Sequence, residues 1–436
     1  MTHSFFIVTY GCQMNEHDSE NIAGRLAAAG FTPADSPENA DVVLVNTCVV
    51  RKSAEERAFG QLTHLKRLKK NRETIIGCCG CLASLRGQDL LKIIPHIDFV
   101  LTTQDIDDVA VIVREAFNTR QAGQFEERAF IPDNRASLRK NTFRAWISIM
   151  KGCDNFCSYC IVPFTRGREI SRPAKEILSE AASLVNDGVR EIVLLGQNVN
   201  SYGLKPGGEI CFAELLAAVA AIPGDFQVRY MTSQPLDFTP SIAEAVAASS
   251  KISRHFHLPM QSGSDRILSL MNRRYTVEGY EAIVSQIRDT VPGASVTTDI
   301  ITGFPGETES DFSETIATVE RIRFNGLFVF IYSDRSGTAA QKLPDKVPDQ
   351  VKKARLQQLL SLQESITAEK HAELAGSITR VLAERMTGRA PGQIFGHDTH
   401  NRVVLFQGSK EQLGRFAQVR IKSAGHWALK GELVEA

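Results

Sequence analysis

Three cysteines share one short loop of this chain. Cys153, Cys157 and Cys160 stand in the spacing C-x-x-x-C-x-x-C. A four-iron cluster normally takes four thiolate ligands, so a loop that offers three leaves one iron open to a ligand from outside the protein. Structural zinc also uses closely spaced cysteines, but it needs four ligands, and no fourth cysteine or histidine lies near Cys160 in the sequence. The spacing therefore predicts an iron–sulfur cluster with one reactive iron.

A second group of cysteines follows the ends of predicted strands. Residues 5–10 lead to Cys12, residues 41–46 lead to Cys48, and residues 74–77 lead to a run that contains Cys78, Cys79 and Cys81. Because the carboxyl ends of parallel strands meet at one edge of a sheet, three of these thiols are expected to converge on a second cluster. Spacing alone does not choose among the three cysteines of the last run. For any single cysteine the alternative is a small buried apolar residue at a strand end, and Cys211 is interpreted in that way.

The composition describes an ordinary folded chain with reduced cysteines. Its 436 residues suggest two or three domains, and 50 basic residues balance 50 acidic ones, so any surface for nucleic acid must be local. Nine cysteines in a long chain suit metal ligation better than a disulfide framework. No apolar stretch approaches the roughly 18 residues of a membrane helix, and no signal peptide is recognised, so we expect a cytoplasmic location and no membrane partner.

The order of predicted elements indicates an α/β fold in three domains. Residues 1–125 alternate strands and helices as an N-terminal parallel sheet domain does. Residues 139–368 carry six strand-and-helix units, which predict a partial (βα)6 barrel followed by a long charged helix from Asp349. Residues 371–436 read as short strands of a small β-barrel, with nine Lys and Arg against six Asp and Glu. A basic small barrel suits RNA, although a purely structural appendage is the alternative.

The cysteine loop resembles that of radical S-adenosylmethionine (SAM) enzymes. The resemblance implies a partial barrel, SAM chelated to the open iron through its amino and carboxylate groups, and reductive cleavage of SAM to a 5′-deoxyadenosyl radical. Loops at the carboxyl ends of the predicted barrel strands carry residues suited to a nucleoside and an amino acid. The candidate SAM contacts are Tyr159, Gly196, Gln197, Asn198, Ser233, Gln261, Gly303 and Glu307.

Ordered motifs along nearly the whole chain resemble the methylthiotransferase family. They are Thr9 to Glu20, Asn46-Thr47-Cys48, Lys151 to Arg168 and Leu258 to Ser264. The family's third ligand of the auxiliary cluster lies in a Gly-Cys-apolar-Ala pattern, which implies Cys81 in Gly80-Cys81-Leu82-Ala83. Two features depart from the family pattern, namely the extra neighbours Cys78 and Cys79, and Ser336 where the family often has proline.

The resemblance also implies a substrate and a route. The stretches Tyr10 to Asn15 and Pro163 to Arg168 resemble the branch that acts on dimethylallyl-adenosine next to the tRNA anticodon. Other branches act on threonylcarbamoyl-adenosine or on an aspartate of a ribosomal protein, and these remain alternatives. The implied cofactors are two 4Fe-4S clusters and SAM. The resemblance implies that Cys153, Cys157 and Cys160 hold the cluster that forms the radical. It implies that Cys12, Cys48 and Cys81 hold the cluster that presents methylated sulfur to the adenine C2.

The partners implied are the tRNA anticodon loop, a reductant such as flavodoxin or ferredoxin, and a sulfur source, with the chain acting as a monomer. The C-terminal barrel is similar to an RNA-binding TRAM domain. Candidate RNA contacts are Arg166, Arg168, Arg380, Arg402, Arg420 and Lys422. A different class of function, an iron–sulfur electron carrier or scaffold that tethers RNA, is the rival hypothesis.

Overall fold

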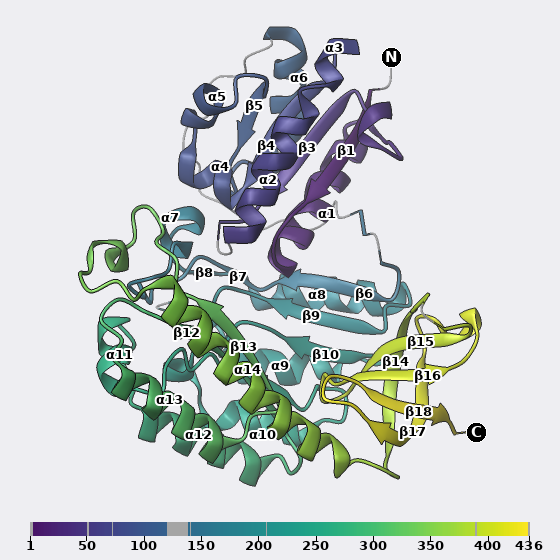
Figure 1. Cartoon of the computed structure of the whole chain (residues 1–436). Coiled ribbons are helices and arrows are strands. Elements are labelled where there is room, and N and C mark those ends of the chain that lie inside the picture. The colour runs from purple at the N-terminus through teal and green to yellow at the C-terminus, as the bar shows by residue number, and fades with distance from the viewer. Residues whose placement is uncertain are drawn as a thin grey trace.

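The computed structural model describes residues 3–49, 52–71, 73–119, 138–139, 141–205, 207–388 and 390–434. Figure 1 shows three bodies. The N-terminal domain lies above the central barrel, and the C-terminal barrel lies beside the central barrel, at the lower right of the view. The predicted domain limits at residues 1, 125 and 436 lie outside the described ranges. In the part of the chain that is described, no helix combines the length and apolar character needed to cross a membrane.

The N-terminal domain is a parallel sheet with helices on both faces. Its strands are β1 (Ser4–Thr9), β2 (Thr32–Pro33), β3 (Val42–Thr47), β4 (Ile75–Gly80) and β5 (Phe99–Leu101), in the order β2-β1-β3-β4-β5. Its helices are α1 (Gln13–Ala28), α2 (Lys52–Leu65), α3 (Leu68–Asn71), α4 (Cys81–Arg86), α5 (Asp89–Ile93) and α6 (Val109–Thr119). Alternate residues of β3 enter two separate apolar cores, one beneath α1 and α6 and one beneath α2, α4 and α5. Burial on both faces explains why this strand is almost wholly apolar.

The central domain is a curved parallel barrel made of two three-stranded sheets. The strands are β6 (Arg144–Ser148), β9 (Glu191–Leu195) and β10 (Gln227–Tyr230) in one sheet, and β11 (His255–His257), β12 (Ser295–Thr302) and β13 (Gly326–Ile331) in the other. A parallel bridge between Val228 and Ile252 connects the sheets on the β10 side. The strands β6 and β13 are the outer strands of the two sheets.

Helices cover the outside of this barrel, as the alternation of strands and helices predicts. They are α8 (Ala174–Asn186), α9 (Phe212–Ala221), α10 (Pro240–Ala248), α11 (Asp265–Leu270), α12 (Val277–Thr290), α13 (Glu309–Ile322) and the long α14 (Asp349–Ala372). A short antiparallel pair, β7 (Met150–Lys151) with β8 (Ile170–Ser171), and the helix α7 (Val162–Arg166) bracket the cysteine loop. Single turns of 3₁₀ helix are η1 (Pro37–Asn39), η2 (Ile106–Asp108), η3 (Val199–Ser201), η4 (Pro235–Asp237), η5 (Ala339–Lys342) and η6 (Lys410–Gln412).

The C-terminal body is a closed five-stranded barrel. Its strands are β14 (Ile378–Met386), β15 (Gln393–Asp398), β16 (Val403–Gln407), β17 (Phe416–Ala424) and β18 (Leu429–Leu433), in the order β14-β15-β16-β18-β17. The sequence predicts strands at residues 377–385, 392–396, 402–407 and 415–422, and these match β14, β15, β16 and β17; β18 was not predicted. All neighbouring strands are antiparallel except β16 and β18.

A buried charge network joins the C-terminal barrel to the amino-terminal end of the central barrel. Glu191, whose side chain is 1% exposed, pairs with Arg144 and, at 2.6 Å, with Arg229. Arg144 also pairs at 2.7 Å with Glu384 of β14, which in turn lies 2.6 Å from His397. Buried charges are tolerated only when they are paired, so this junction holds one end of the barrel closed in a defined orientation.

The junction predicts a change of stability with pH. Burial alone would raise the pKa of Glu384, but the hydrogen bond and charge of His397 and the charge of Arg144 outweigh it, and the pKa falls from 4.5 to about 2. A carboxyl with a lowered pKa in the folded state contributes stability above about pH 4.5 and loses it as the pH falls toward 2. The melting temperature of the metal-free chain should therefore drop less from about pH 5 to about pH 3 in Glu384→Gln than in the unmodified protein. Glu432→Gln, at an exposed pair, should keep the unmodified slope; equal slopes for all three proteins would contradict the assignment.

Candidate active site

The first cysteine set lies at the carboxyl edge of the N-terminal sheet. Cys12 caps α1, Cys48 follows β3 directly, and Cys81 is the first residue of α4. The chain at Cys12 passes very close to Cys48, since a Cβ built on Gly11 would lie 2.8 Å from the Cβ of Cys48. The Cys81 thiol in turn has Cys12 among its electrostatic neighbours. The structure thus brings the three predicted thiols to one place, two of them at helix N-termini, where the helix dipole favours a thiolate.

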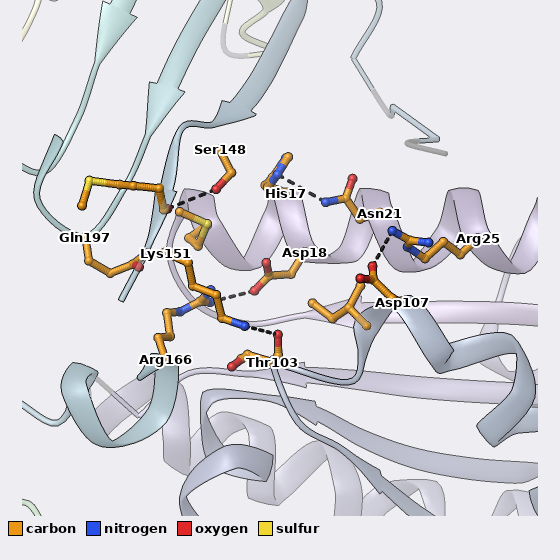
Figure 2. A pocket seen from close by; sticks show the side chains of 13 residues that line it. His17, Asp18, Asn21, Arg25, Thr103, Asp107, Ser148, Lys151, Arg166 and Gln197 are labelled. Atoms are coloured by element: carbon orange, nitrogen blue, oxygen red, sulfur yellow. Dashed lines mark hydrogen bonds and ion pairs between the residues drawn. The ribbon is translucent and has the colours of Figure 1, made fainter. Parts of the chain in front are cut away.

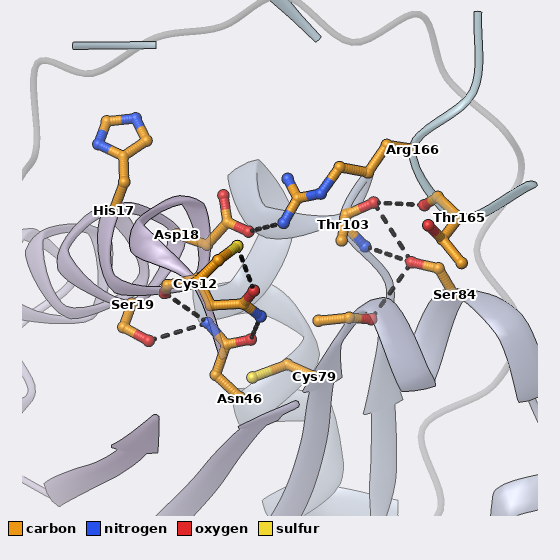
Figure 3. A network of polar contacts seen from close by, with 12 residues as sticks. Cys12, His17, Asp18, Ser19, Asn46, Cys79, Ser84, Thr103, Thr165 and Arg166 are labelled. Carbon is orange, nitrogen blue, oxygen red and sulfur yellow. Dashed lines mark hydrogen bonds and ion pairs between the residues drawn. The ribbon is translucent and has the colours of Figure 1, made fainter. Parts of the chain in front are cut away.

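Amide side chains hold the turn that carries Cys12. The Cys12 thiol donates to Asn15 Oδ1 at 3.3 Å, while Asn15 Nδ2 donates to Asn46 Oδ1 and to the carbonyl of Thr47, each at 3.0 Å. Figure 3 shows Cys12 and Asn46 in this network. Asn15 and Asn46 are fully buried. Gly80 has φ +87° and passes so close that a Cβ there would lie 2.2 Å from Asn46 Oδ1. This packing explains the glycine immediately before Cys81.

The two neighbouring cysteines have different surroundings. Cys78 and Cys79 lie within β4, so their side chains point to opposite faces of the sheet, and each enters one of the two apolar cores. Burial raises the pKa of the Cys78 thiol to about 12. The prediction that β4 ends before these residues was wrong, because the strand continues to Gly80. Cys81 therefore remains our choice for the third position.

The second cysteine set occupies the loop between β7 and α7. Cys153, Cys157 and Cys160 are half-buried and influence one another electrostatically. Two hydrogen-bond donors reach their sulfurs: Asn155 Nδ2 lies 3.5 Å from Cys153 Sγ, and Arg273 Nη1 lies 3.3 Å from Cys157 Sγ. No sequence signal pointed to Arg273, because it arrives from the loop between α11 and α12, more than a hundred residues along the chain.

A buried ion pair joins the two cysteine sets. Arg166, in α7, donates from Nη2 to Asp18 Oδ2 at 2.7 Å, and the two side chains are 6% and 9% exposed. Arg166 also faces Cys81 and Cys12: its charge opposes the rise that burial causes in the pKa of Cys81. Figure 3 shows its guanidinium directed from α7 toward α1. One segment, residues 153–166, therefore carries one cysteine set and reaches the other.

Polar contacts surround this pair. Thr103, after β5, donates from Oγ1 to the carbonyl of Thr165 at 2.9 Å, and Lys151 Nζ donates to the carbonyl of Thr103 at 3.0 Å. A cavity of about 20 Å³, room for about one water molecule, lies among these residues and α1 (Figure 2). Burial, followed by the charge of Arg166, lowers the pKa of Lys151 to about 8. The contact between the two domains is thus polar around Arg166 and Asp18.

The donor sets fit iron–sulfur clusters better than single ions. Among the described residues, no three Cys, His, Asp or Glu side chains are placed to hold one metal ion. Thiolates around a single zinc crowd to about 2.3 Å from the metal, whereas a cluster is wider and spreads its ligands. Burial raises the pKa of Cys160 to about 12, with a further contribution from Cys157. Such thiols ionise when a metal centre takes the proton's place.

The predicted SAM contacts lie in loops at the carboxyl end of the barrel. They differ in how deeply they are buried and in whether their polar atoms already have partners in the protein. Gln197 Oε1 accepts from the backbone N–H of Gly152, and Tyr159 packs among the apolar residues around Phe304. Gly196 has no room for a Cβ beside Met150. Ser233 is buried, and Gln261 is buried with φ +71°.

Besides Gln197, two more of these side chains have partners in the protein. Asn198 Nδ2 donates to Asp237 at 2.6 Å, and its Oδ1 accepts from the backbone of Gln234. Glu307 accepts from the N–H of Gly303 at 2.6 Å and from Arg355 at 2.7 Å, both distances involving Oε2. Their carboxylate and amide groups brace the loops, which argues against direct side-chain contact with SAM.

The predicted RNA contacts divide into exposed and buried residues. Arg168 is 73% exposed and Lys422 is 55% exposed, and Arg420 is partly exposed. Arg380 lies over the ring of Phe416 and pairs with Asp225. The structure argues against two of the predictions: Arg166 is buried against Asp18, as described above, and Arg402 is held at 2.7 Å by Asp398, whose side chain is fully buried. A cation that is buried and paired is not available to phosphate.

An apolar group inside the barrel has no counterpart in the predicted site. Met14, from the first turn of α1, packs against Val193 and Leu195 of β9, with Trp146 and Met231 partly buried beside them. Side chains alternate along β9, and Ile192 and Leu194 of this strand belong to the core beneath the helices. Met14 therefore brings an apolar side chain of the N-terminal domain to the interior of the central barrel.

Known families match all three bodies. The pattern named Uncharacterized protein family UPF0004 matches residues 4–102, the Radical SAM superfamily matches residues 147–319, and the TRAM domain matches residues 373–434. Among solved structures, the radical SAM methyltransferase TsrM from Kitasatospora setae, determined with cobalamin and a [4Fe-4S] cluster, has a TM-score of 0.57 at 16% identity and covers 91% of this chain and 81% of its own. That likeness supports the fold alone.

Curated relatives match over nearly the whole length. The tRNA-2-methylthio-N(6)-dimethylallyladenosine synthase of Carboxydothermus hydrogenoformans is 42% identical, with 99% of each chain covered. Proteins of the same name from Syntrophotalea carbinolica and Dictyoglomus thermophilum are 42% and 43% identical and cover 99% of this chain, with 100% and 98% of their own lengths included.

The buried pair between the domains predicts a large effect of one neutralising substitution. Asp18→Asn leaves Arg166 buried without a full counter-charge, and breaking a buried pair in this way costs about 3–5 kcal/mol. Glu432→Gln breaks the exposed pair with Lys422, 2.6 Å apart and more than half exposed on each side, and should cost at most about 1 kcal/mol. Thermal denaturation of the iron-loaded proteins measures both. Similar melting temperatures for the two variants would show that the Arg166 pair does not hold the domains together.

Proposed function

The chain belongs to the family of tRNA-2-methylthio-N(6)-dimethylallyladenosine synthases, and we propose that it adds a methylthio group to C2 of the dimethylallyl-adenosine next to the tRNA anticodon. It is a radical SAM sulfur transferase whose cofactors are SAM and 4Fe-4S clusters. A TRAM domain supports a tRNA partner. The cytoplasm is its proposed location, because the RNA substrate is made there.

The observation that carries this proposal is the arrangement of two cysteine sets about one buried contact. When bound, the clusters and SAM supply radical chemistry at a C–H bond that is neither acidic nor electrophilic. We assign Cys153, Cys157 and Cys160 to the SAM-binding cluster and Cys12, Cys48 and Cys81 to the sulfur-carrying one. Arg166 and Asp18 hold the segment of the first set against the second, so the two sets keep a fixed separation.

Hydrogen-bond donors of the chain surround the cysteines of the loop. Asn155 and Arg273 direct N–H groups at two sulfurs of the loop, and hydrogen bonds to thiolates offset part of their negative charge. Gln197 fixes the backbone of Gly152 immediately before Cys153.

The interior apolar group favours the dimethylallyl substrate over the alternatives. Met14, Val193 and Leu195 present hydrocarbon, with Trp146 beside them, and burying a five-carbon branched group against such residues is favourable by about 0.8 kcal/mol per carbon. A threonylcarbamoyl group carries a carboxylate, which would be left unpaired among these side chains. Met14 is also part of the sequence stretch that resembles the dimethylallyl-adenosine branch.

The RNA would be held mainly outside the barrel. We propose that Arg380, Arg420 and Lys422 of the C-terminal barrel contact the phosphates, and that the target base leaves its stack to enter the central barrel, as single-stranded RNA loops allow. An external sulfur source, an external electron donor and action as a monomer complete the proposal.

The cysteine assignment predicts two separable losses. Cys157→Ala should abolish SAM cleavage by the dithionite-reduced enzyme, whereas Cys81→Ala should retain SAM cleavage and lose the methylthio product. Each should bind about four irons instead of about eight. Cys211→Ala, at the start of α9, serves as the matched control and should keep both activities. Nucleoside mass spectrometry, SAM analysis and iron content measure these outcomes; a carrier protein would bind iron and leave SAM intact in every case.

The apolar group predicts a change of substrate preference. Met14→Ser removes apolar contact worth about 1–2 kcal/mol, so affinity for an anticodon stem-loop with dimethylallyl-adenosine should fall roughly tenfold. Affinity for the same stem-loop with unmodified adenosine should stay unchanged, and Met14→Leu should retain the preference. Val111→Ser, on the exposed surface of α6, is the control. Equal weakening of both RNAs would remove Met14 from prenyl recognition.

A further inference from the structure

An exposed group of aromatic and cationic side chains lies directly outside the cysteine loop. It consists of Phe156, Phe164, Arg168, Lys205 and Arg274, which we call the loop face. Phe156 is 40% exposed and Phe164 is 56% exposed. The side chains of Arg168 and Lys205 are 73% and 48% exposed, and Arg274 is exposed as well. Aromatic and arginine side chains are the types enriched where proteins bind partners.

The loop face is held in shape without a partner. Phe156 has φ +45°, a conformation that side chains rarely adopt, and its carbonyl accepts from Asn272 Nδ2 at 2.9 Å. The rings of Phe156 and Phe164 meet edge to face with centroids 6.4 Å apart, and the Arg168 guanidinium lies 5.2 Å from the Phe156 centroid. The strained backbone of Phe156 and the exposure of two aromatic rings are features that binding sites share, and packing within this domain does not require them.

The charge on this surface is mainly positive. Arg168 and Lys205 each lie 3.0 Å from Asp154, which is only 16% exposed, so the cations and not the carboxylate face the solvent. Arg274 adds a third cation through its hydrogen bond to Asn155 Oδ1 at 3.1 Å. Such a surface attracts a partner with an acidic face.

The loop face is connected to the cysteines that it covers. From Arg274 a hydrogen bond leads to Asn155, whose Nδ2 lies 3.5 Å from Cys153 Sγ. Phe156 is the residue before Cys157. A partner seated here is therefore separated from the candidate cluster by little more than the loop itself.

The surface lies away from the RNA-binding candidate. In Figure 1, α7, which carries Phe164, and α11 lie at one end of the central barrel, whereas β14 to β18 lie at the other. Arg168 was predicted to contact RNA, but it follows α7 and so lies at the opposite end from Arg380, Arg420 and Lys422; we therefore assign it to a different partner.

The proposed function requires an electron that neither RNA nor SAM supplies. Reductive cleavage of one SAM consumes one electron at the site of Cys153, Cys157 and Cys160. We propose that the loop face docks a small acidic one-electron carrier protein that reduces this site. One electron passes from the carrier, which is oxidised, to the iron–sulfur site, which is reduced, and no bond or proton moves at the surface. The inference rests on the proposed function.

Charge reversal tests the docking surface. In the reconstituted holoenzyme, Arg168→Glu combined with Arg274→Glu should slow reduction by reduced flavodoxin at least tenfold and remove its dependence on salt, as followed by stopped-flow absorbance. Reduction by dithionite, iron content and affinity for an anticodon stem-loop should not change. Arg321→Glu combined with Lys92→Glu, at exposed cations on α13 and α5, should behave as the unmodified protein.

A second variant tests whether a slower reaction reflects loss of docking or a change in the structure of the cysteine loop. Phe164→Ala changes an exposed ring outside the cysteine spacing and should also slow the reaction with flavodoxin alone. Unchanged flavodoxin rates in both variants would overturn the proposal, and so would a loss of stem-loop affinity with normal reduction, which would assign the surface to RNA. If the unmodified protein fails to cleave SAM even with dithionite, the proposed function fails, while the flavodoxin reduction rates still decide the docking surface.

Discussion

The buried pair between Arg166 and Asp18 is the interaction on which the arrangement of this molecule depends. A guanidinium that is 6% exposed must find a counter-charge, and the carboxylate that satisfies it comes from the first helix of another domain. Because α7 follows the cysteine loop without a break, the orientation of α1 is fixed relative to that loop. A second ion pair joins the same two domains: Arg335, which follows β13, lies 3.0 Å from Glu55 of α2. The two cysteine sets are thereby held relative to each other by charge.

The interior of the central barrel changes character along its axis, and each end is closed by a different domain. Charged residues around Glu191 fill the amino-terminal end, where the C-terminal barrel supplies Glu384. Hydrocarbon from Val193 and Leu195 follows at the middle, and Met14 of the N-terminal domain joins it. The cysteines lie at the carboxyl end.

The sequence predicted what depends on local pattern and missed what depends on distant partners. The strand ending near Cys48 was predictable because parallel strands buried on both faces have a distinctive composition, and the β-rich run before Cys12 indicated the other. Arg166 was predicted to meet phosphate because it lies near the cysteine loop, but it is buried, and its partner lies 148 residues earlier in the chain. The last strand, β18, was missed because Gly431 weakens its pattern. That glycine is required, since a Cβ there would lie 2.4 Å from Val419 where the barrel closes.

Two arginines illustrate how one residue type can serve opposite purposes around the same loop. Arg273 is buried and donates to Cys157, and its other donors are taken by Tyr275 and by the carbonyl of Pro259, so its charge stays inside the protein. Arg168 is exposed and lies over Phe156, so solvent screens its effect on the sulfurs and its field extends outward instead. An arginine inside the loop can stabilise an electron-rich site, while an arginine outside it can attract the protein that delivers electrons. These two roles are separate because neighbouring residues of the loop point to opposite sides. Cys157 meets the buried Arg273, and Phe156 meets the exposed Arg168.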